Sequence, residues 1–273
     1  MSIIKVQTNY YQQFDADYSL DVPAEGYGGW KEAELELNLD KTGIVLMHSM
    51  HYGKREDIPG LFRACEWLPR AYEMGEKVIP GLIRAARDAG IKVIHVAGGK
   101  FDKNHPGYRK VLELAGKPKV LERIETDTVL DGLLAFKRDN GFPGVHNLPS
   151  YVACDQYTDF VKNTYPLDDE AIVENEDHMI AVCREYGLNH LIYVGYNINW
   201  CVMFASGGFM HIYRNGILCS TIRQAVTAVE NKESARTGMG KEIALWTIAV
   251  GFGFVYDLDD FIQAIRGADT KQG

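Results

Sequence analysis

The sequence predicts an α/β fold, namely a doubly wound, mainly parallel sheet with helices on both faces, as in Rossmann-like three-layer domains. From residue 42 almost to the end, short apolar stretches typical of strands alternate with stretches whose apolar residues recur at helical spacing. Gly90 and Gly187 follow two of the helical stretches, where stop signals are expected. Parallel strands need helical crossovers, so this alternation indicates a sheet that is covered on both faces.

The elements can be assigned in order along the chain. Residues 1–40 are polar and aromatic and predict an N-terminal arm or lid, followed by a single domain at 41–273. Residues 98–169 are irregular and contain Gly-Gly and X-Pro pairs, which predicts an insertion with short helices, one of them at 127–137. Strands are expected at 42–47 (TGIVLM), 92–96 (KVIHV), 171–173, 191–194 (LIYV), 217–221 and 254–256, and helices at 71–89, 177–186, 202–213 and 234–250.

The composition of the chain limits the kinds of molecule that the protein could bind. The 273 residues are 46% hydrophobic and 24% charged, which is enough material for a sizeable core. The net charge of -8 argues against nucleic acid, because phosphate contacts need clustered Lys and Arg. No apolar run is long enough to span a bilayer, and the N-terminus lacks the apolar core of a signal peptide. We therefore expect a cytoplasmic protein that acts on a small molecule, with no nucleic-acid or membrane partner.

The cysteines point to one candidate nucleophile. All five are scattered, with no C-x-x-C pair, so neither a disulfide framework nor a thiolate zinc site is indicated, and no metal or cofactor is expected. Cys201 follows a predicted strand and a tight loop and begins a predicted helix. Unpaired amides and the helix dipole stabilise a thiolate at that position. The alternative is that Cys201 is a small buried apolar residue, as most free cysteines are.

Three loops are expected to meet in one crevice. In open parallel sheets, ligands bind beyond the carboxyl ends of the strands. The loops after Met47, after Val173 and before Cys201 all lie at such ends. The predicted site therefore combines side chains from these three loops.

At these residues the chain resembles a known family. The stretch IPGLIRAARDAGIKVIHV, and more specifically GYNINWCV followed by FMHIYRNGILCSTIRQAVTA, is similar to the isochorismatase-like cysteine hydrolases, which include nicotinamidases and N-carbamoylsarcosine amidases. The resemblance covers residues 40–265. It implies a doubly wound fold and amide hydrolysis by a triad of aspartate, lysine and cysteine. It also implies that Cys201 is the nucleophile, that the amides of Asn197 and Cys201 form an oxyanion hole, and that the Tyr196–Asn197 peptide bond is cis.

The sequence departs from the family pattern at the other two triad positions. Met47 stands where the family has its aspartate, and Ser49 where a glutamine follows. A shift of one residue would instead place His48 there, and an imidazole can accept a thiol proton. Glu174 or Asn175 stands where the lysine is expected, while Lys162 lies upstream.

Three functions follow as alternatives. The first is hydrolysis of a small amide or related C–N bond, with Cys201, His48 and Glu174 catalytic and with Asn197, Trp200, His51 and His95 binding the oxyanion or substrate. The second is a catalytically degenerate relative that binds a small ligand or a protein partner. The third is metal-dependent chemistry on His48, His51 and His95, with Asp102 or His105 completing the set.

Two further patterns suggest contacts between subunits. Gly207 and Gly208 lie within the predicted helix 202–213, where each glycine is costly unless another backbone approaches closely. The arm carries six aromatic residues, which favours packing on its own domain or on a neighbouring subunit over a role as a lid. We therefore expect a homo-oligomer.

Overall fold

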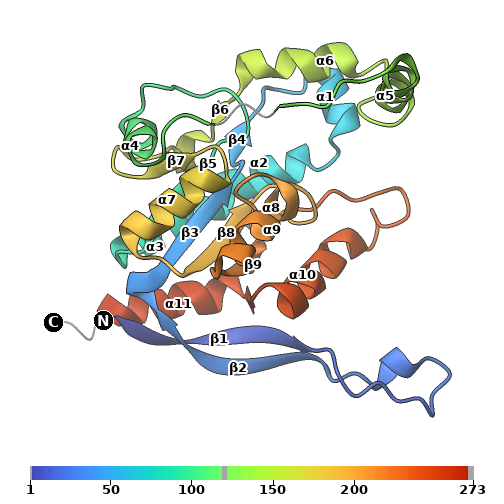
Figure 1. Ribbon diagram of the computed structural model, residues 1–273. Coiled ribbons are helices and arrows are strands. Elements are labelled where there is room, and N and C mark those ends of the chain that lie inside the picture. The colour runs from blue at the N-terminus through green and yellow to red at the C-terminus, as the bar shows by residue number, and fades with distance from the viewer. Residues whose placement is uncertain (1, 119–121, 270–273) are drawn as a thin grey trace.

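The computed structural model describes residues 2–118 and 122–269 (Figure 1). Within this part of the chain the main sheet has eight strands. In spatial order they are β2 (Gly29–Asn38), β1 (Ile3–Gln12), β10 (Val255–Tyr256), β9 (Leu218–Val226), β8 (His190–Gly195), β3 (Thr42–Met47), β5 (Lys92–Val96) and β7 (Ala171–Val173). The six strands from β10 to β7 are parallel to one another. β1 pairs antiparallel with both β10 and β2. The α/β fold class is confirmed.

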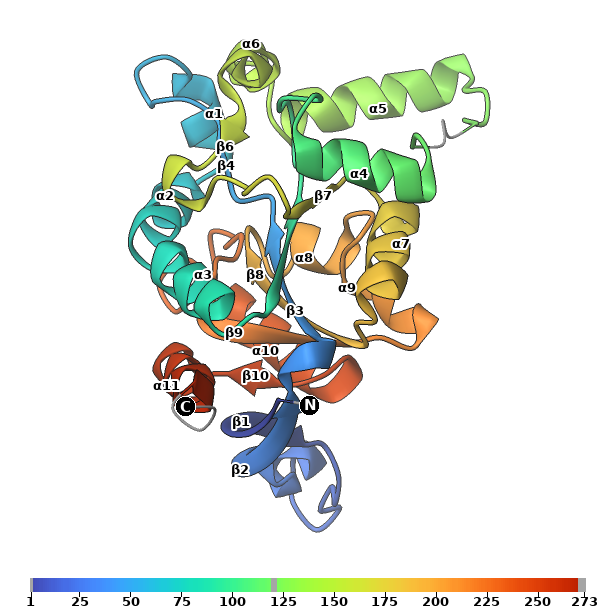
Figure 2. The ribbon, with the colours of Figure 1, turned by 90° about the vertical axis from the view of Figure 1, so that its left-hand side faces the viewer.

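Helices cover both faces of the sheet (Figures 1 and 2). Alternate residues of each strand point to opposite faces, so Val45 and Met47 belong to one apolar cluster, and Ile44 and Leu46 to the other. The first cluster is covered by α7 (Glu176–Tyr186), α8 (Cys201–Phe204), α9 (Phe209–Ile212) and α10 (Met239–Gly251). The second is covered by α2 (Leu68–Lys77), α3 (Ile79–Asp88) and α11 (Leu258–Asp269).

Smaller elements lie above the carboxyl ends of the strands, mostly in the stretch predicted as an insertion (Figure 2). They are α1 (Pro59–Ala64), α4 (Pro106–Ala115), α5 (Thr128–Asn140), α6 (Leu148–Ala153) and the two-stranded pair β4 (Met50–His51) and β6 (Asp159–Phe160). Single 3-10 turns occur at Pro23–Gly26, Leu39–Lys41, Cys154–Tyr157, Lys162–Thr164 and Tyr213–Asn215. None of the helices in the described ranges has the length and apolar composition needed to cross a bilayer.

The arm expected at residues 1–40 is a β-hairpin that extends the sheet. Its strands pair from Ile3↔Asn38 to Gln12↔Gly29, and β1 joins the sheet edge at Asn9↔Val255. Tyr11 makes edge-to-face contacts with Trp30 and with Trp246 of α10, at 5.4 and 6.4 Å between ring centroids. These aromatic residues of the arm therefore pack on their own chain.

Two predicted helices are divided in the structure. The stretch 71–89 forms α2 and α3, which meet at Val78, with Pro80 in the first turn of α3, where its missing N–H costs no hydrogen bond. The stretch 202–213 forms α8 and α9 because Gly207 has a φ of +99°. A Cβ at Gly208 would lie 2.7 Å from the carbonyl oxygen of Val202, so the predicted close backbone approach is present, but between helices and not within one.

Candidate active site around Cys201

Cys201 lies at the carboxyl end of β8, as predicted. The strand ends at Gly195, the loop follows, and Cys201 is the first residue of α8. Gly195 has a φ of +112°, and a Cβ there would lie 2.2 Å from the carbonyl oxygen of Met47, so the loop can start this close to β3 only with glycine. The Tyr196–Asn197 bond is cis, as the family resemblance implied.

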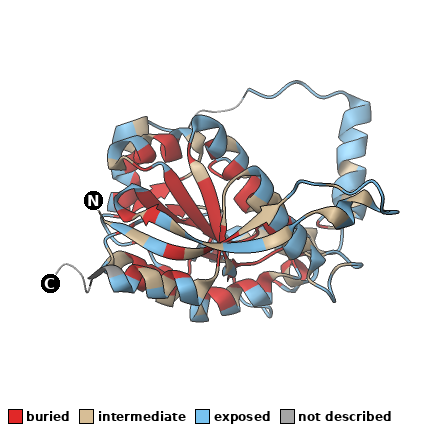
Figure 3. Cartoon of the chain, turned by 90° about the horizontal axis from the view of Figure 1, so that it is seen from below, coloured by how far each residue is buried: buried red, intermediate tan, exposed pale blue. Residues whose placement is uncertain are grey.

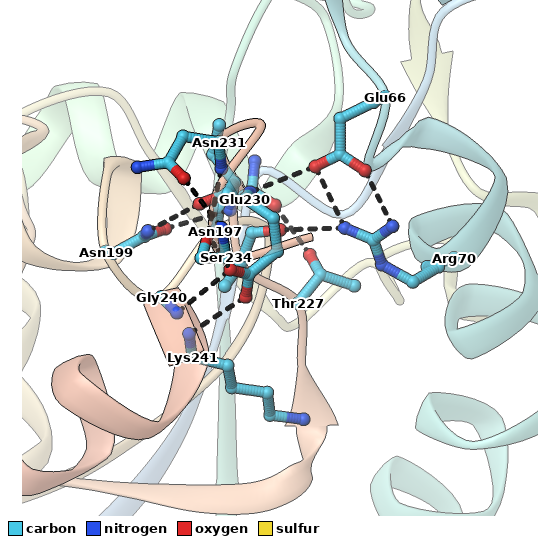
Figure 4. A network of polar contacts seen from close by, with 12 residues as sticks. Glu66, Arg70, Asn197, Asn199, Thr227, Glu230, Asn231, Ser234, Gly240 and Lys241 are labelled. Carbon is cyan, nitrogen blue, oxygen red and sulfur yellow. Dashed lines mark hydrogen bonds and ion pairs between the residues drawn. The ribbon is translucent and has the colours of Figure 1, made fainter. Parts of the chain in front are cut away.

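The chain that follows β9 holds this loop in place (Figure 4). The buried side chain of Asn197 accepts a hydrogen bond of 2.7 Å from the Thr227 hydroxyl, and the Ile198 N–H donates to the Thr227 carbonyl at 2.7 Å. The Asn199 amide exchanges two hydrogen bonds with the backbone of Val229, at 2.8 and 2.9 Å. The Thr227 N–H also donates to the Gly195 carbonyl at 3.2 Å, so the loop before Cys201 is fixed by hydrogen bonds on both sides of the cis bond.

A charged network continues from this contact (Figure 4). The Glu230 carboxylate accepts hydrogen bonds from the backbone N–H groups of Gly240 and Lys241, at 2.9 and 3.0 Å, so it caps the start of α10. The Glu230 N–H donates to Glu66, which is bound by Arg70 of α2. The network links helices on opposite faces of the sheet through the segment that supports the loop.

The Cys201 thiol is partly exposed, and two opposing effects act on its pKa. Burial raises the pKa and is the larger effect, while the main-chain N–H groups of Asn197 and Cys201 hydrogen-bond the sulfur and lower it. The net shift is upward, so the resting form is the thiol. This corrects the expectation of a thiolate stabilised by a helix dipole, because α8 is one turn long and aligns few peptide dipoles.

The strand end next to Cys201 has no carboxylate. Met47 is fully buried in the apolar cluster on which Cys201 packs, so it is a core residue. His48 follows the strand with a φ of +48°, and its ring lies against Gly98, where a Cβ would be 2.5 Å from the imidazole Cγ. Burial lowers the pKa of His48 to about 4, so the imidazole is neutral at pH 7 and is a weaker proton acceptor than an exposed histidine.

Glu174 is held by partners that the sequence analysis missed. Lys103 and the Tyr108 hydroxyl both donate to its carboxylate. Burial raises the pKa of Glu174, but these contacts outweigh it, and the net pKa is lowered. The Lys103 ammonium also lies 4.0 Å from the centroid of the Phe101 ring. No periodic pattern in the sequence indicates this pairing, because Lys103 and Glu174 are 71 residues apart.

The other two predicted histidines have partners of their own. His95 is buried on the sheet face opposite to Ile94 and Val96. Its Nε2 lies 2.9 Å from the Glu170 carboxylate, and Glu170 also binds Arg87. His51 stacks on Tyr72 at 4.7 Å between ring centroids. In the described ranges no three His, Cys, Asp or Glu side chains are grouped so that they could hold a metal ion.

Several aromatic side chains lie near Cys201. Trp200, directly before Cys201, is 59% exposed. Burial raises the pKa of the Tyr52 phenol, and a Cys201 thiolate would raise it further, which places the two groups near each other. The Tyr52 ring contacts Trp67, which in turn contacts Tyr196 of the loop. Tyr52 was missed although it follows the predicted His48–His51 segment directly.

The arrangement around Cys201 contains a thiol and two amide donors but no adjacent charged pair. Among the described residues, no carboxylate, imidazole or ammonium group contributes to the pKa shift of Cys201. The site can therefore stabilise negative charge on the sulfur or on a bound oxyanion through the two amides. Removal of the thiol proton therefore needs a basic group that moves close to the sulfur, a water molecule, or a pH high enough to ionise the thiol.

No family model and no curated protein matches this sequence. Solved structures are similar to it at low identity. They include a cysteine hydrolase from Pseudomonas syringae pv. phaseolicola (17% identity, TM-score 0.49, 85% of this chain and 95% of that one) and an isochorismatase-like hydrolase from Alkaliphilus metalliredigens (16%, 0.45, 83% and 98%). A third is the nicotinamidase from Staphylococcus aureus (12%, 0.36, 77% and 96%). The chain is similar to isochorismatase-family cysteine hydrolases. This is the family that its sequence resembles.

Proposed function

We propose that the protein is a hydrolase that acts on a small amide or related C–N bond through Cys201. The main support is that the N–H groups of Asn197 and Cys201 both point at the sulfur, from a loop fixed by Thr227. A carbonyl carbon bonded to this sulfur would place its oxygen within reach of the same donors. Removing one donor of this type costs about 3–4 kcal/mol of transition-state stabilisation in a hydrolase where it has been tested.

The proposed reaction has two stages. The Cys201 sulfur attacks the carbonyl carbon, and the C–N bond breaks to leave a thioester. In this proposal His48 moves within reach of the sulfur, accepts the thiol proton and passes it to the leaving nitrogen. Water then attacks the thioester, one proton returns to the sulfur, and a carboxylic acid is released. Glu174 has no chemical role in this proposal because Lys103 and Tyr108 hold its carboxylate.

We also propose a substrate class, a domain division and a cellular compartment for the protein. The substrate is a small molecule, bound under the aromatic residues at the mouth of the site. Five free cysteines among the described residues support a reducing compartment such as the cytoplasm. We propose one hydrolase domain at 41–273 preceded by the hairpin arm, and a homo-oligomer.

The test is a screen of small amides, followed by mass spectrometry of the intact protein. A substrate should leave an acyl adduct on Cys201, and Cys201→Ala should abolish both adduct and turnover. Cys154→Ala is the matched control, because Cys154 is also partly exposed. Turnover that survives in Cys201→Ala would show that the proposed mechanism is wrong.

A second candidate is ligand binding without turnover. The observation that favours it is the loss of both charged triad positions, since Met47 is core and Glu174 is bound by Lys103. This function predicts that compounds binding near Cys201 slow its alkylation but are recovered intact. Release of an amine or ammonia that depends on Cys201 would exclude it.

A further inference from the structure

The hydroxyl group of Tyr52 has no hydrogen-bond partner within the chain. Buried residues concentrate in the parallel strands and in the sides of the helices that face them (Figure 3). Tyr52 lies outside these elements, directly after β4, and is partly exposed. Its hydroxyl makes no hydrogen bond with any residue in the described ranges. Because the hydroxyl of a tyrosine packed on a core usually has a partner, this one is left for a bound molecule.

The position of Tyr52 is fixed by its backbone and its ring. The Tyr52 N–H donates to the hydroxyl of Tyr72 at 2.9 Å, and the same hydroxyl donates to the Gly53 carbonyl at 3.0 Å. The Tyr52 ring packs edge-to-face on Trp67, with 6.5 Å between ring centroids, and against the apolar cluster that contains Leu61 of α1. None of these contacts uses the Tyr52 hydroxyl, so they do not explain why the residue is tyrosine.

Two observations place this phenol near the Cys201 sulfur. First, Tyr52 lies on the chain that leaves β3, and Cys201 on the chain that leaves β8. These strands are neighbours in the sheet, and their ends pair at Met47↔Gly195. Second, burial raises the pKa of the Tyr52 phenol, and a Cys201 thiolate would raise it more than any other charge in the described ranges. The hydroxyl and the sulfur therefore lie close together at the carboxyl ends of two adjacent strands.

The Tyr52 phenol is a donor that keeps its proton. Burial and the neighbouring thiol hold its pKa well above the ordinary range of a tyrosine. Such a phenol does not release its proton at neutral pH, but it can donate a hydrogen bond to a negatively charged oxygen. Among the described residues, no cationic side chain contributes to the pKa shift of Cys201, so neutral donors must stabilise negative charge at this position.

We propose that the Tyr52 hydroxyl is a catalytic group that donates a hydrogen bond to the carbonyl oxygen of the substrate bonded to Cys201. This inference rests on the proposed hydrolysis through Cys201. The hydroxyl acts together with the main-chain N–H groups of Asn197 and Cys201, so donors from two loops hold the same oxygen. Their hydrogen bonds strengthen as the carbonyl oxygen becomes an oxyanion, and this difference lowers the barrier of the reaction.

Reversible addition of small aldehydes to Cys201 tests this role without a known substrate. The thiol adds to the aldehyde, so that an S–C bond forms, the carbonyl double bond becomes single and the thiol proton moves to the oxygen. The oxygen of this adduct takes the place of the substrate oxyanion. The adduct also blocks alkylation, so the dissociation constants of propanal and benzaldehyde are obtained from the slowing of Cys201 alkylation by iodoacetamide, measured by peptide mass spectrometry on the full chain.

Tyr52→Phe removes the hydroxyl and keeps the ring. It should weaken aldehyde binding about tenfold, because one hydrogen bond to the adduct oxygen is lost. Alkylation of Cys201 without aldehyde should keep its rate, since the amides of Asn197 and Cys201 hydrogen-bond the sulfur and Tyr52 does not. Tyr157→Phe is the matched control. Tyr157 lies against the same segment, where a Cβ at Gly53 would be 3.1 Å from the Tyr157 Cβ, and its loss of a hydroxyl should leave aldehyde binding unchanged.

The amide screen supplies a second readout once a substrate is found. Tyr52→Phe should lower kcat by about tenfold or more and leave KM unchanged, because the donor acts on the transition state. A rise in KM at constant kcat would assign the hydroxyl to ground-state binding and overturn its catalytic role.

The possible failures can be told apart. Equal aldehyde affinities in the unmodified protein and in Tyr52→Phe would overturn the role of Tyr52 and leave the proposed hydrolase standing. A change in the alkylation rate as large as the change in aldehyde binding, or a loss of circular dichroism, would show that the hydroxyl supports packing and would also overturn its role. Aldehydes that do not protect Cys201 in the unmodified protein would instead remove the oxyanion site, and with it the proposed mechanism.

Discussion

At the scale of single residues, the sulfur of Cys201 is subject to two opposing influences. Its partly buried position favours the neutral thiol, and the amides of Asn197 and Cys201 favour the thiolate. Burial is the larger influence. A helix N-terminus therefore does not guarantee a reactive cysteine, because the desolvation of the anion can exceed what two neutral donors provide.

This balance predicts a late onset of thiol reactivity. Alkylation of Cys201 by iodoacetamide, followed by peptide mass spectrometry, should accelerate with pH and show a midpoint above the usual thiol value. Buried Cys183 should remain unlabelled under native conditions, since burial raises its pKa to about 12. A midpoint for Cys201 below pH 8 would contradict this prediction and indicate a charged neighbour.

His48 allows a second test at this scale. His48→Asn should lower kcat by about 10²–10⁴ if the imidazole accepts the thiol proton. Asparagine tolerates the positive φ of this position, so the backbone should remain intact. Because the pKa of His48 is about 4, its contribution should be present at neutral pH and disappear as pH falls toward 4. His51→Asn is the control, and an equal loss there would remove the special role of His48.

At the scale of elements, the segment after β9 holds the loop before Cys201 in place. Its most buried contact is the hydrogen bond from Thr227 to the Asn197 side chain. Thr227 is 30 residues from Asn197, and strand pairing between β8 and β9 brings them together.

Thr227→Val should therefore destabilise the fold, because it leaves the buried Asn197 oxygen without a donor. The expected loss in the free energy of unfolding is about 1–3 kcal/mol, measured by urea titration. Thr247→Val removes a similar hydroxyl contact at an exposed site on α10 and should change stability by less than about 0.5 kcal/mol. Equal effects at the two sites would show that the contact with Asn197 has no particular importance.

At the scale of the whole molecule, buried histidines make stability depend on pH. Burial lowers the pKa of both His48 and His190 to about 4, whereas histidines in an unfolded chain titrate near 6.5. Between these values the unfolded chain binds protons that the folded chain does not. Burial raises the pKa of Glu170, but hydrogen bonds from His95 and Arg87 outweigh burial, and the net pKa is about 2. The stabilising contribution of the Glu170 carboxylate is therefore lost only below about pH 4.5.

The free energy of unfolding should thus fall as pH is lowered from 6.5 toward 4. Urea titrations at several pH values measure it. His190→Gln should reduce the slope, because one of the buried histidines with a lowered pKa is removed while a polar side chain remains near Ser220. A free energy of unfolding that stays constant from pH 7 to pH 4.5 would contradict the lowered pKa values of His48 and His190.

The sequence by itself determined the architecture and the place of Cys201 beyond the end of β8. The strands at 42–47, 92–96 and 171–173 occur as predicted, because short apolar runs between helical stretches are a local signal of strands buried on both faces. The cis bond before Asn197 followed from the family resemblance.

Only the tertiary structure decided the chemistry around the sulfur. It brought Thr227 to Asn197 and Lys103 to Glu174, and it docked the hairpin on α10. It also raised the pKa of Cys201 and left α5 uncovered. Contacts between residues that are distant in the chain have no period in the sequence, and a pKa depends on the burial that packing creates.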